Sequence, residues 1–140
     1  MKVLILCTGN SCRSQMAHGF LQSVNMDWEV HSAGTNPAFV VNRRAVQVMK
    51  EVDIDISTHF PKSVWRYLNE EWDYVITVCG GANENCPTFT GKVRHRIHVG
   101  FDDPSDAVGS EEFVMNEFRR VRDEIGLWCK NFSDGQSYFS

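Results

Sequence analysis

Two cysteines and an arginine stand close together near the N-terminus, in the stretch CTGNSCRS at residues 7–14, directly after an apolar run. If the chain passes here from a buried strand into the first turn of a helix, successive backbone N–H groups can curl around one tetrahedral oxyanion. Glycine permits the tight turn, and asparagine tolerates unusual backbone dihedrals. We therefore predict an oxyanion-binding loop composed of Thr8, Gly9, Asn10, Ser11, Cys12, Arg13 and Ser14.

Cys7 and Arg13 are the reactive groups of this loop, and five residues separate them. The guanidinium offers a planar fork of donors that suits two oxygens of phosphate or arsenate. Together with the loop amides and the helix dipole, it should lower the pKa of the Cys7 thiol, so that Cys7 is a thiolate at neutral pH. Cys12 receives no required role beyond its place in the loop. An ordinary turn between a strand and a helix is the alternative interpretation.

Two other classes of site are disfavoured. The sequence contains no G-x-x-x-x-G-K-[ST] motif, which a Walker-type nucleotide loop needs. Zinc is disfavoured because Cys7 and Cys12, like Cys79 and Cys86, lack the usual C-x2-4-C spacing, so we predict no metal site. The fifth cysteine, Cys129, is expected to be a packed core residue.

The elements that position this loop follow from the hydrophobic pattern. Short apolar runs predict strands, and apolar residues at helical spacing predict helices, with Ser110 as the N-cap of the last one. Strands that alternate with helices imply right-handed crossovers and a doubly wound α/β sheet in one domain, residues 1–140. The predicted strands are 3–7, 28–32, 74–79 and 96–99; the predicted helices are 16–24, 45–52, 114–132 and, more weakly, 62–68.

Composition limits the partners. The chain has 140 residues, with 14 basic and 18 acidic side chains and a net charge of −4, which argues against nucleic acid or an anionic membrane as a partner. No apolar run is long enough for a membrane span or a signal peptide. The chain has five cysteines, an odd number, and is large enough to fold without cross-links. In a reducing compartment such cysteines are more often catalytic, redox-active or metal-binding than structural disulfides. We expect a cytoplasmic monomer.

The chain resembles the low-molecular-weight protein tyrosine phosphatase superfamily, and it resembles the thioredoxin-coupled arsenate reductase branch of that superfamily more closely. The resemblance covers nearly the whole chain and implies a small four-stranded parallel sheet flanked by helices. The motifs that carry it are CTGNSCRSQMA at 7–17, HSAGT at 31–35, VCGGANENCP at 78–87, GFDDP at 100–104 and RVRDEIG at 120–126.

The resemblance implies a thiol relay. Cys7 attacks arsenate, Cys79 attacks the resulting adduct and releases arsenite, and Cys86 then resolves the Cys7–Cys79 disulfide. No tightly bound cofactor is expected, and reduced thioredoxin supplies the electrons. A phosphatase acting on tyrosine or another small phosphoester is the main alternative, because it needs only Cys7. A non-catalytic oxyanion-binding or redox-sensing module is the third possibility.

The resemblance also implies a general acid. Asp103, directly before Pro104, matches the acid of the superfamily, while Asp102 is expected to be a solvated neighbour. The alternative for this stretch is a plain surface turn. Ser105 stands where the phosphatases carry an aromatic residue against the substrate ring, which favours a small inorganic substrate.

Several arsenate reductases of the resembled branch hold a potassium ion beside the loop, through its asparagine, a glutamate on the first helix, a serine on the second strand and an acidic residue before the small third helix. Here Asn10 and Ser32 match, but His18 stands at the glutamate position and Lys62 near that of the acid. We expect no potassium, and we expect the Lys62 ammonium to replace the ion and steady the loop through Asn10. The alternative is that Lys62 is a solvated residue at a helix start.

Overall fold

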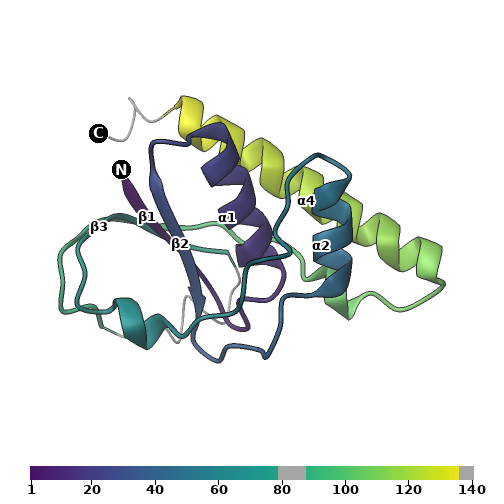
Figure 1. Ribbon diagram of the computed structural model, residues 1–140, viewed down its shortest axis with the longest axis horizontal. Helices are drawn as coiled ribbons and strands as arrows, with labels where there is room; N and C mark the ends of the chain where they lie inside the picture. The colour runs from purple at the N-terminus through teal and green to yellow at the C-terminus, as the bar shows by residue number, and fades with distance from the viewer. Residues whose placement is uncertain (79–87, 136–140) are drawn as a thin grey trace.

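The computed structural model describes residues 1–78 and 88–135. Its centre is a parallel four-stranded sheet with the order β2-β1-β3-β4, shown in Figure 1. β1 lies in the interior and is fully buried from Val3 to Leu6, as a strand covered on both faces should be. The strands are β1 (Lys2–Cys7), β2 (Glu29–Gly34), β3 (Trp72–Thr77) and β4 (Val93–His98).

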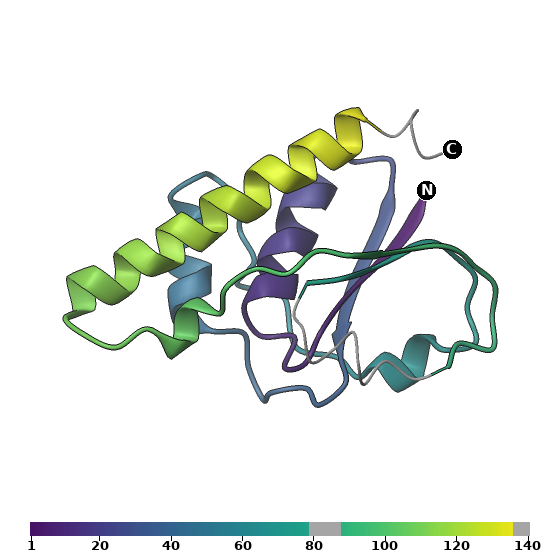
Figure 2. The same ribbon diagram turned by 180° about the vertical axis from the view of Figure 1, so that it is seen from behind.

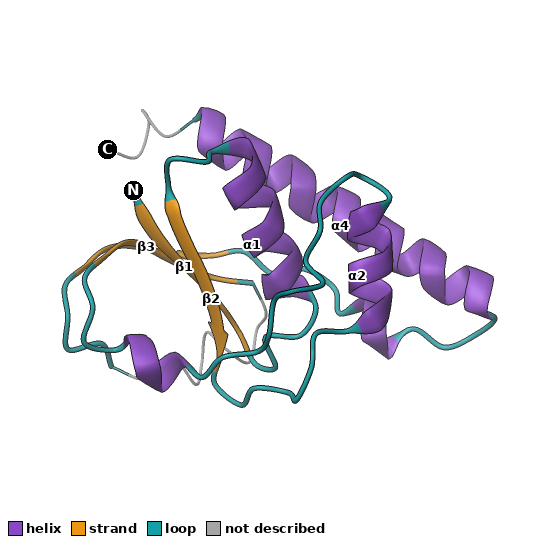
Figure 3. Ribbon diagram, in the orientation of Figure 1, coloured by secondary structure: helices purple, strands orange, loops and turns teal. Residues whose placement is uncertain are grey.

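Three α-helices of the described chain pack in one layer. Figures 1 and 2 show α1 alongside α4 in both views, with α2 next to α4. Figure 3 shows the short 3-10 helix η1 (Val64–Tyr67) apart from them. Val64 and Tyr67 of η1 belong to the smaller of two buried hydrophobic clusters among the described residues, together with Leu4, Leu6, Ala33, Trp72, Val75 and Phe89. The other helices are α1 (Arg13–Val24), α2 (Arg43–Lys50), α4 (Glu111–Asp134) and the 3-10 turn η2 (Pro104–Asp106).

The predicted fold class, a small doubly wound four-stranded parallel sheet flanked by helices, is confirmed. Ser110 caps α4 as expected, since its Oγ accepts a hydrogen bond from the Phe113 amide at 3.1 Å. Most element boundaries differ from the predicted ones by one to three residues: β4, for example, begins at Val93 rather than residue 96, and α1 begins at Arg13 rather than residue 16. The weak helix predicted at 62–68 is only the 3-10 turn η1. β3 ends at Thr77, and the predicted strand end at Cys79 lies outside the described residues.

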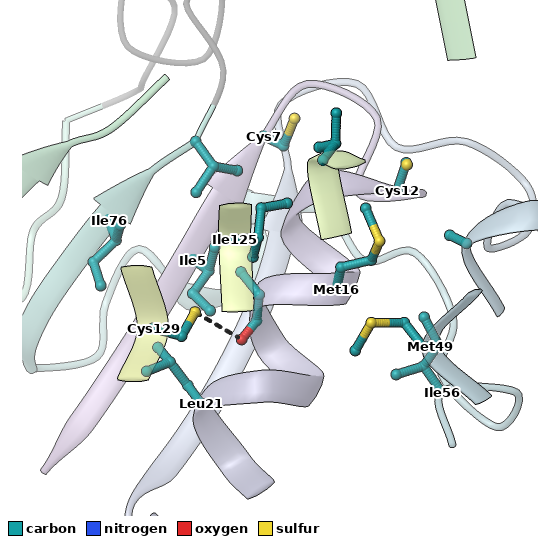
Figure 4. Close-up of a cluster of buried hydrophobic side chains, with 14 of the residues drawn as sticks. Ile5, Cys7, Cys12, Met16, Leu21, Met49, Ile56, Ile76, Ile125 and Cys129 are labelled. Carbon is teal, nitrogen blue, oxygen red and sulfur yellow. Dashed lines mark hydrogen bonds between the residues drawn. The ribbon is translucent and has the colours of Figure 1, made fainter. Parts of the chain in front are cut away.

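Cys129 lies in the larger core cluster, fully buried among Ile5, Leu21 and Ile125, as Figure 4 shows. Its thiol points to the carbonyl of Ala17 at 3.8 Å. Burial raises the pKa of this thiol to about 12, so it stays protonated and acts as a packing residue. Among residues 1–78 and 88–135, no helix combines the length and apolar character that crossing a membrane requires.

Candidate active site

The predicted oxyanion loop joins the carboxyl end of β1 to the first turn of α1. Together with two residues from the region of η2, it lines a cavity of about 240 Å³. Pockets for drug-sized ligands begin at roughly 300 Å³, so this cavity suits a small ion. Its lining residues in the described chain are Cys7, Thr8, Gly9, Asn10, Ser11, Cys12, Arg13, Asp103 and Ser105.

The loop is held from outside through its carbonyl groups. The segment 35–42, which follows β2, donates backbone hydrogen bonds to the carbonyls of Cys7, Thr8, Gly9 and Ser11 at distances of 3.2, 2.9, 2.9 and 2.7 Å. In a planar trans peptide the N–H points opposite to the C=O. The N–H groups that follow these four carbonyls therefore point away from segment 35–42. An anion-binding loop of the predicted kind requires amides that are not turned toward the segment that holds its carbonyls.

Gly34 allows the loop to come this close to the end of β2. It pairs with Cys7 across the sheet, and a Cβ atom added at this position would collide with the carbonyl oxygen of Thr8. The same atom would lie 3.1 Å from the amide nitrogen of Asn10. Any residue with a side chain would push the loop outward.

Arg13 and Asp103 meet at the edge of the cavity. The guanidinium donates to the carbonyl of Phe101 at 3.0 Å and pairs with Asp103 Oδ2 at 3.3 Å. Both side chains are largely shielded, with 15% and 27% of their surface exposed. Asp102, by contrast, is 77% exposed and pairs with Arg120 at 3.2 Å. Of the two carboxylates in the motif, the structure brings Asp103 to the loop.

Asn10 is the internal support of the loop. It is fully buried and has a φ of 51°, a left-handed conformation that asparagine tolerates. Its Nδ2 donates to Ser14 Oγ at 2.8 Å, and its Oδ1 accepts from the Lys62 amide at 3.0 Å. Ser14, predicted as an anion ligand, is not among the described residues that line the cavity. It is fully buried and stabilises the loop by accepting the hydrogen bond from Asn10.

Gln15 is a site residue that the sequence analysis missed. It is fully buried, and its Nε2 donates to the backbone carbonyl of Asn10, to Asn10 Oδ1 and to the carbonyl of Phe60 at 3.1, 3.2 and 3.2 Å. Its Oε1 lies 2.9 Å from His59 Nδ1, which must carry the proton because Oε1 only accepts. The one signal in the sequence was that Gln15 is a polar residue in the first turn of the helix that follows the loop. Its spacing from the loop does not distinguish it from a polar side chain exposed to solvent.

The expectation for Lys62 is wrong. Its backbone amide, not its ammonium, contacts Asn10, while the Nζ atom lies 3.1 Å from the carbonyl of Phe60 and over the Phe60 ring. The reason is main-chain pairing: the Gly34 amide donates to the Lys62 carbonyl at 2.8 Å and fixes the Lys62 backbone beside the loop. The contacts of the side chain are with Phe60.

The residues present do not fit a potassium site. His18 stands where the resemblance places a carboxylate, and its Nδ1 lies 2.9 Å from Ser32 Oγ. Burial, reinforced by His59 at a ring distance of 4.6 Å, lowers the pKa of His18 to about 3, so the ring is neutral. Asn10 Oδ1 already accepts two hydrogen bonds. A hard cation would find a neutral imidazole and occupied oxygens instead of carboxylates.

Cys12 is a packed thiol rather than a second nucleophile. It is 6% exposed, belongs to the core cluster and lies beside Met16, as Figure 4 shows. Burial, with a contribution from the charge of Asp103, raises the pKa of this thiol to about 12. Its contribution to the loop is its backbone, because its carbonyl accepts the first hydrogen bond of α1 from Met16 at 2.9 Å.

Cys79 and Cys86, predicted as relay cysteines, lie outside the described residues. The chain just before them is described. The Val78 amide donates to the carbonyl of Leu6 at 3.0 Å, and the Val78 carbonyl accepts from the Phe101 amide at 3.2 Å. Val78 therefore lies between the end of β1 and the residue whose carbonyl holds Arg13.

Comparisons with known proteins agree with this geometry. Residues 2–136 match the model of the low molecular weight phosphotyrosine protein phosphatase family. An arsenate reductase of Halalkalibacterium halodurans is 46% identical over 133 residues, covering 94% of each chain, and an arsenate reductase of Bacillus subtilis is similar to the same extent.

Among solved structures, an arsenate reductase in the phosphate binding state superimposes with a TM-score of 0.78 at 28% identity, over 94% of this chain and 95% of the other. The family model spans nearly the entire chain, and the site described above falls within the matched residues. The chain belongs to the low molecular weight phosphotyrosine protein phosphatase family.

Proposed function

We propose that this protein reduces arsenate to arsenite by a relay of Cys7, Cys79 and Cys86, and that thioredoxin regenerates the reduced enzyme. One observation carries the proposal: a cavity of about 240 Å³ that combines a nucleophilic cysteine, an anion loop and the Arg13–Asp103 pair. The similarity to proteins named arsenate reductase supports the choice of substrate, at 46% identity over 94% of the chain.

In the first step the Cys7 thiolate attacks arsenic in bound arsenate. The loop amides and the Arg13 guanidinium bind the remaining oxygens and stabilise their charge. One arsenic–oxygen bond breaks as the sulfur–arsenic bond forms. Hydroxide is a poor leaving group, so Asp103 donates a proton to the departing oxygen, which leaves as water.

The second step transfers two electrons. The Cys79 thiolate attacks the Cys7 sulfur, the sulfur–arsenic bond breaks, and its electron pair stays on arsenic, which leaves as arsenite. Cys86 then attacks Cys79, which frees Cys7 and leaves a Cys79–Cys86 disulfide for thioredoxin to reduce. Support for this order comes from the sequence. Cys79 directly follows the described residue Val78, which lies at the same sheet edge as Cys7, and Cys86 comes seven residues after Cys79.

The test is a coupled assay that follows NADPH oxidation through thioredoxin reductase and thioredoxin when arsenate is added. Wild-type protein should turn over, and Cys7→Ser should be inactive. Cys86→Ser should release about one equivalent of arsenite per enzyme and then stop, because Cys7 and Cys79 together hold the electrons for one turnover. Sustained turnover of Cys86→Ser with thioredoxin as the only reductant would exclude the relay in this order.

A phosphatase acting on a small phosphoester is the second candidate, favoured by the family to which the chain belongs. Its first step would use the same Cys7, Arg13 and Asp103, but a hydrolase has no use for Cys79 or Cys86. Replacement of both relay cysteines by serine separates the two functions. If the double variant loses arsenate reduction but hydrolyses p-nitrophenyl phosphate at an unchanged rate, the relay is assigned to reduction. A wild-type enzyme that hydrolyses the ester but shows no arsenate-dependent turnover is a phosphatase.

A further inference from the structure

Ser105 lines the anion cavity and contacts the carboxylate of Asp103 twice. Its amide donates to Asp103 Oδ1 at 3.0 Å, and its hydroxyl donates to the same oxygen at 2.6 Å. The other oxygen, Oδ2, faces the Arg13 guanidinium at 3.3 Å. The two carboxylate oxygens therefore have different neighbours, one held by Ser105 and the other directed to the anion loop.

This division determines which oxygen can carry a proton. An oxygen that accepts two hydrogen bonds has donor hydrogens in front of its lone pairs, so a proton placed on Oδ1 would face an amide hydrogen that cannot turn away. Oδ2 faces only the guanidinium among the contacts described, and the guanidinium can turn to an incoming oxyanion. The protonated form of Asp103 that donates in the first step then carries its hydrogen on Oδ2.

We propose that Ser105 is a positioning residue that fixes the Asp103 carboxyl group with the proton on the oxygen that faces the bound oxyanion. The inference rests on the proposed role of Asp103 as proton donor. In the step itself the Oδ2–H bond breaks, the proton passes to the departing oxygen, and water leaves. Asp103 becomes a carboxylate that again pairs with Arg13.

The site contains its own control for this proposal. Any residue other than proline at position 105 keeps the amide donor, so Ser105→Ala removes only the hydroxyl. Ser105→Thr keeps the hydroxyl and should keep the carboxyl orientation. We expect Ser105→Ala to slow the arsenate-dependent step about threefold to tenfold, a part of the effect of losing the acid. The inhibition constant of inorganic phosphate should be unchanged, and Ser105→Thr should retain at least half of the wild-type rate.

A double-mutant cycle shows whether Ser105 acts through Asp103. In an Asp103→Asn background, Ser105→Ala should cause no further loss of rate. If the two losses multiply, or if Ser105→Thr is as slow as Ser105→Ala, the proposal is wrong. A weaker phosphate affinity at unchanged rate would also overturn it, because Ser105 would then bind the anion directly.

Hydrolysis of two phosphate esters separates this inference from the proposed function. Phenyl phosphate has a poor leaving group and depends on the proton donor, whereas p-nitrophenyl phosphate depends on it much less. Ser105→Ala should therefore slow phenyl phosphate hydrolysis more than p-nitrophenyl phosphate hydrolysis. If the enzyme hydrolyses esters but does not reduce arsenate, the proposed function is refuted. The role of Ser105 is then still tested by the ratio of the two losses, on phenyl phosphate and on p-nitrophenyl phosphate. An enzyme that acts on neither substrate refutes both, and an equal loss on both esters refutes the role of Ser105.

Discussion

His18 should make this protein lose stability in mild acid. Its pKa in the folded chain is lowered to about 3 from the ordinary value of 6.5, chiefly by burial. Between these two values the unfolded chain binds a proton at His18 that the folded chain does not. The stability that the neutral ring contributes is therefore present above pH 6.5 and is lost as the pH falls toward 3. Integrated from pH 7 to pH 5, the loss in the free energy of unfolding is about 2 kcal/mol.

Urea unfolding at pH 7 and pH 5 measures this loss, and His18→Asn identifies its source. Asparagine keeps a polar atom near Ser32 but does not titrate, so the variant should lose about 2 kcal/mol less than the wild type between the two pH values. Ser32→Ala is the matched control, because it removes the hydrogen-bond partner at 2.9 Å and leaves the buried imidazole in place. It should lower stability at both pH values and keep the wild-type difference between them.

The reasoning fails if His18→Asn loses as much stability as the wild type between pH 7 and pH 5. It also fails if Ser32→Ala abolishes the difference, since the hydrogen bond rather than burial would then control the titration. His59, whose pKa is also lowered mainly by burial, remains in all three proteins.

Three further perturbations test the site itself. Asp103→Asn should slow the arsenate-dependent step by about 10²-fold without weakening phosphate inhibition, because the anion no longer competes with a carboxylate for Arg13; a larger loss from Asp102→Asn would mean that Asp103 is the wrong acid. Gly34→Ala should cost about 1–3 kcal/mol in urea unfolding and weaken phosphate binding, because its Cβ displaces the loop at Thr8; wild-type behaviour would mean that the loop tolerates the shift. Steady-state arsenate reduction should be equal in potassium and sodium buffers, and a several-fold activation specific to potassium would show that the ion site survives.

The anion loop could be predicted from the sequence because it is local. Its residues are consecutive, they follow a buried strand, and they precede an amphipathic helix, so the loop follows from the two elements that flank it. The position of Asp103 could not be predicted from local sequence in the same way, because 90 residues separate it from Arg13. Asp103 was distinguished from Asp102 because it directly precedes Pro104, as the acid of the resembled superfamily does, and not by any hydrophobic periodicity.

The supports of the loop could not be predicted, because they are long-range contacts of inconspicuous atoms. Lys62 was singled out for its ammonium, yet the atom that reaches Asn10 is its backbone amide, which every residue but proline possesses. The true start of β4 was missed for a related reason. β4 is an edge strand, and four of its six residues are exposed. It therefore lacks the apolar run that marks a buried strand.

The geometry of the loop bears on how such a site could choose its substrate. Backbone N–H groups and a guanidinium recognise the shape and charge of a tetrahedral oxyanion, and arsenate and phosphate share both. The described lining of the cavity therefore offers no group that separates the two by binding, and phosphate should compete with arsenate. In the proposed mechanism the distinction lies in the step that follows, because a thiol can reduce a Cys7–arsenic adduct, whereas the corresponding phosphorus adduct can only be hydrolysed. Selectivity for arsenate would then depend on how fast Cys79 attacks relative to water, so Cys79→Ser should lose arsenate reduction entirely while its affinity for either oxyanion stays that of the wild type.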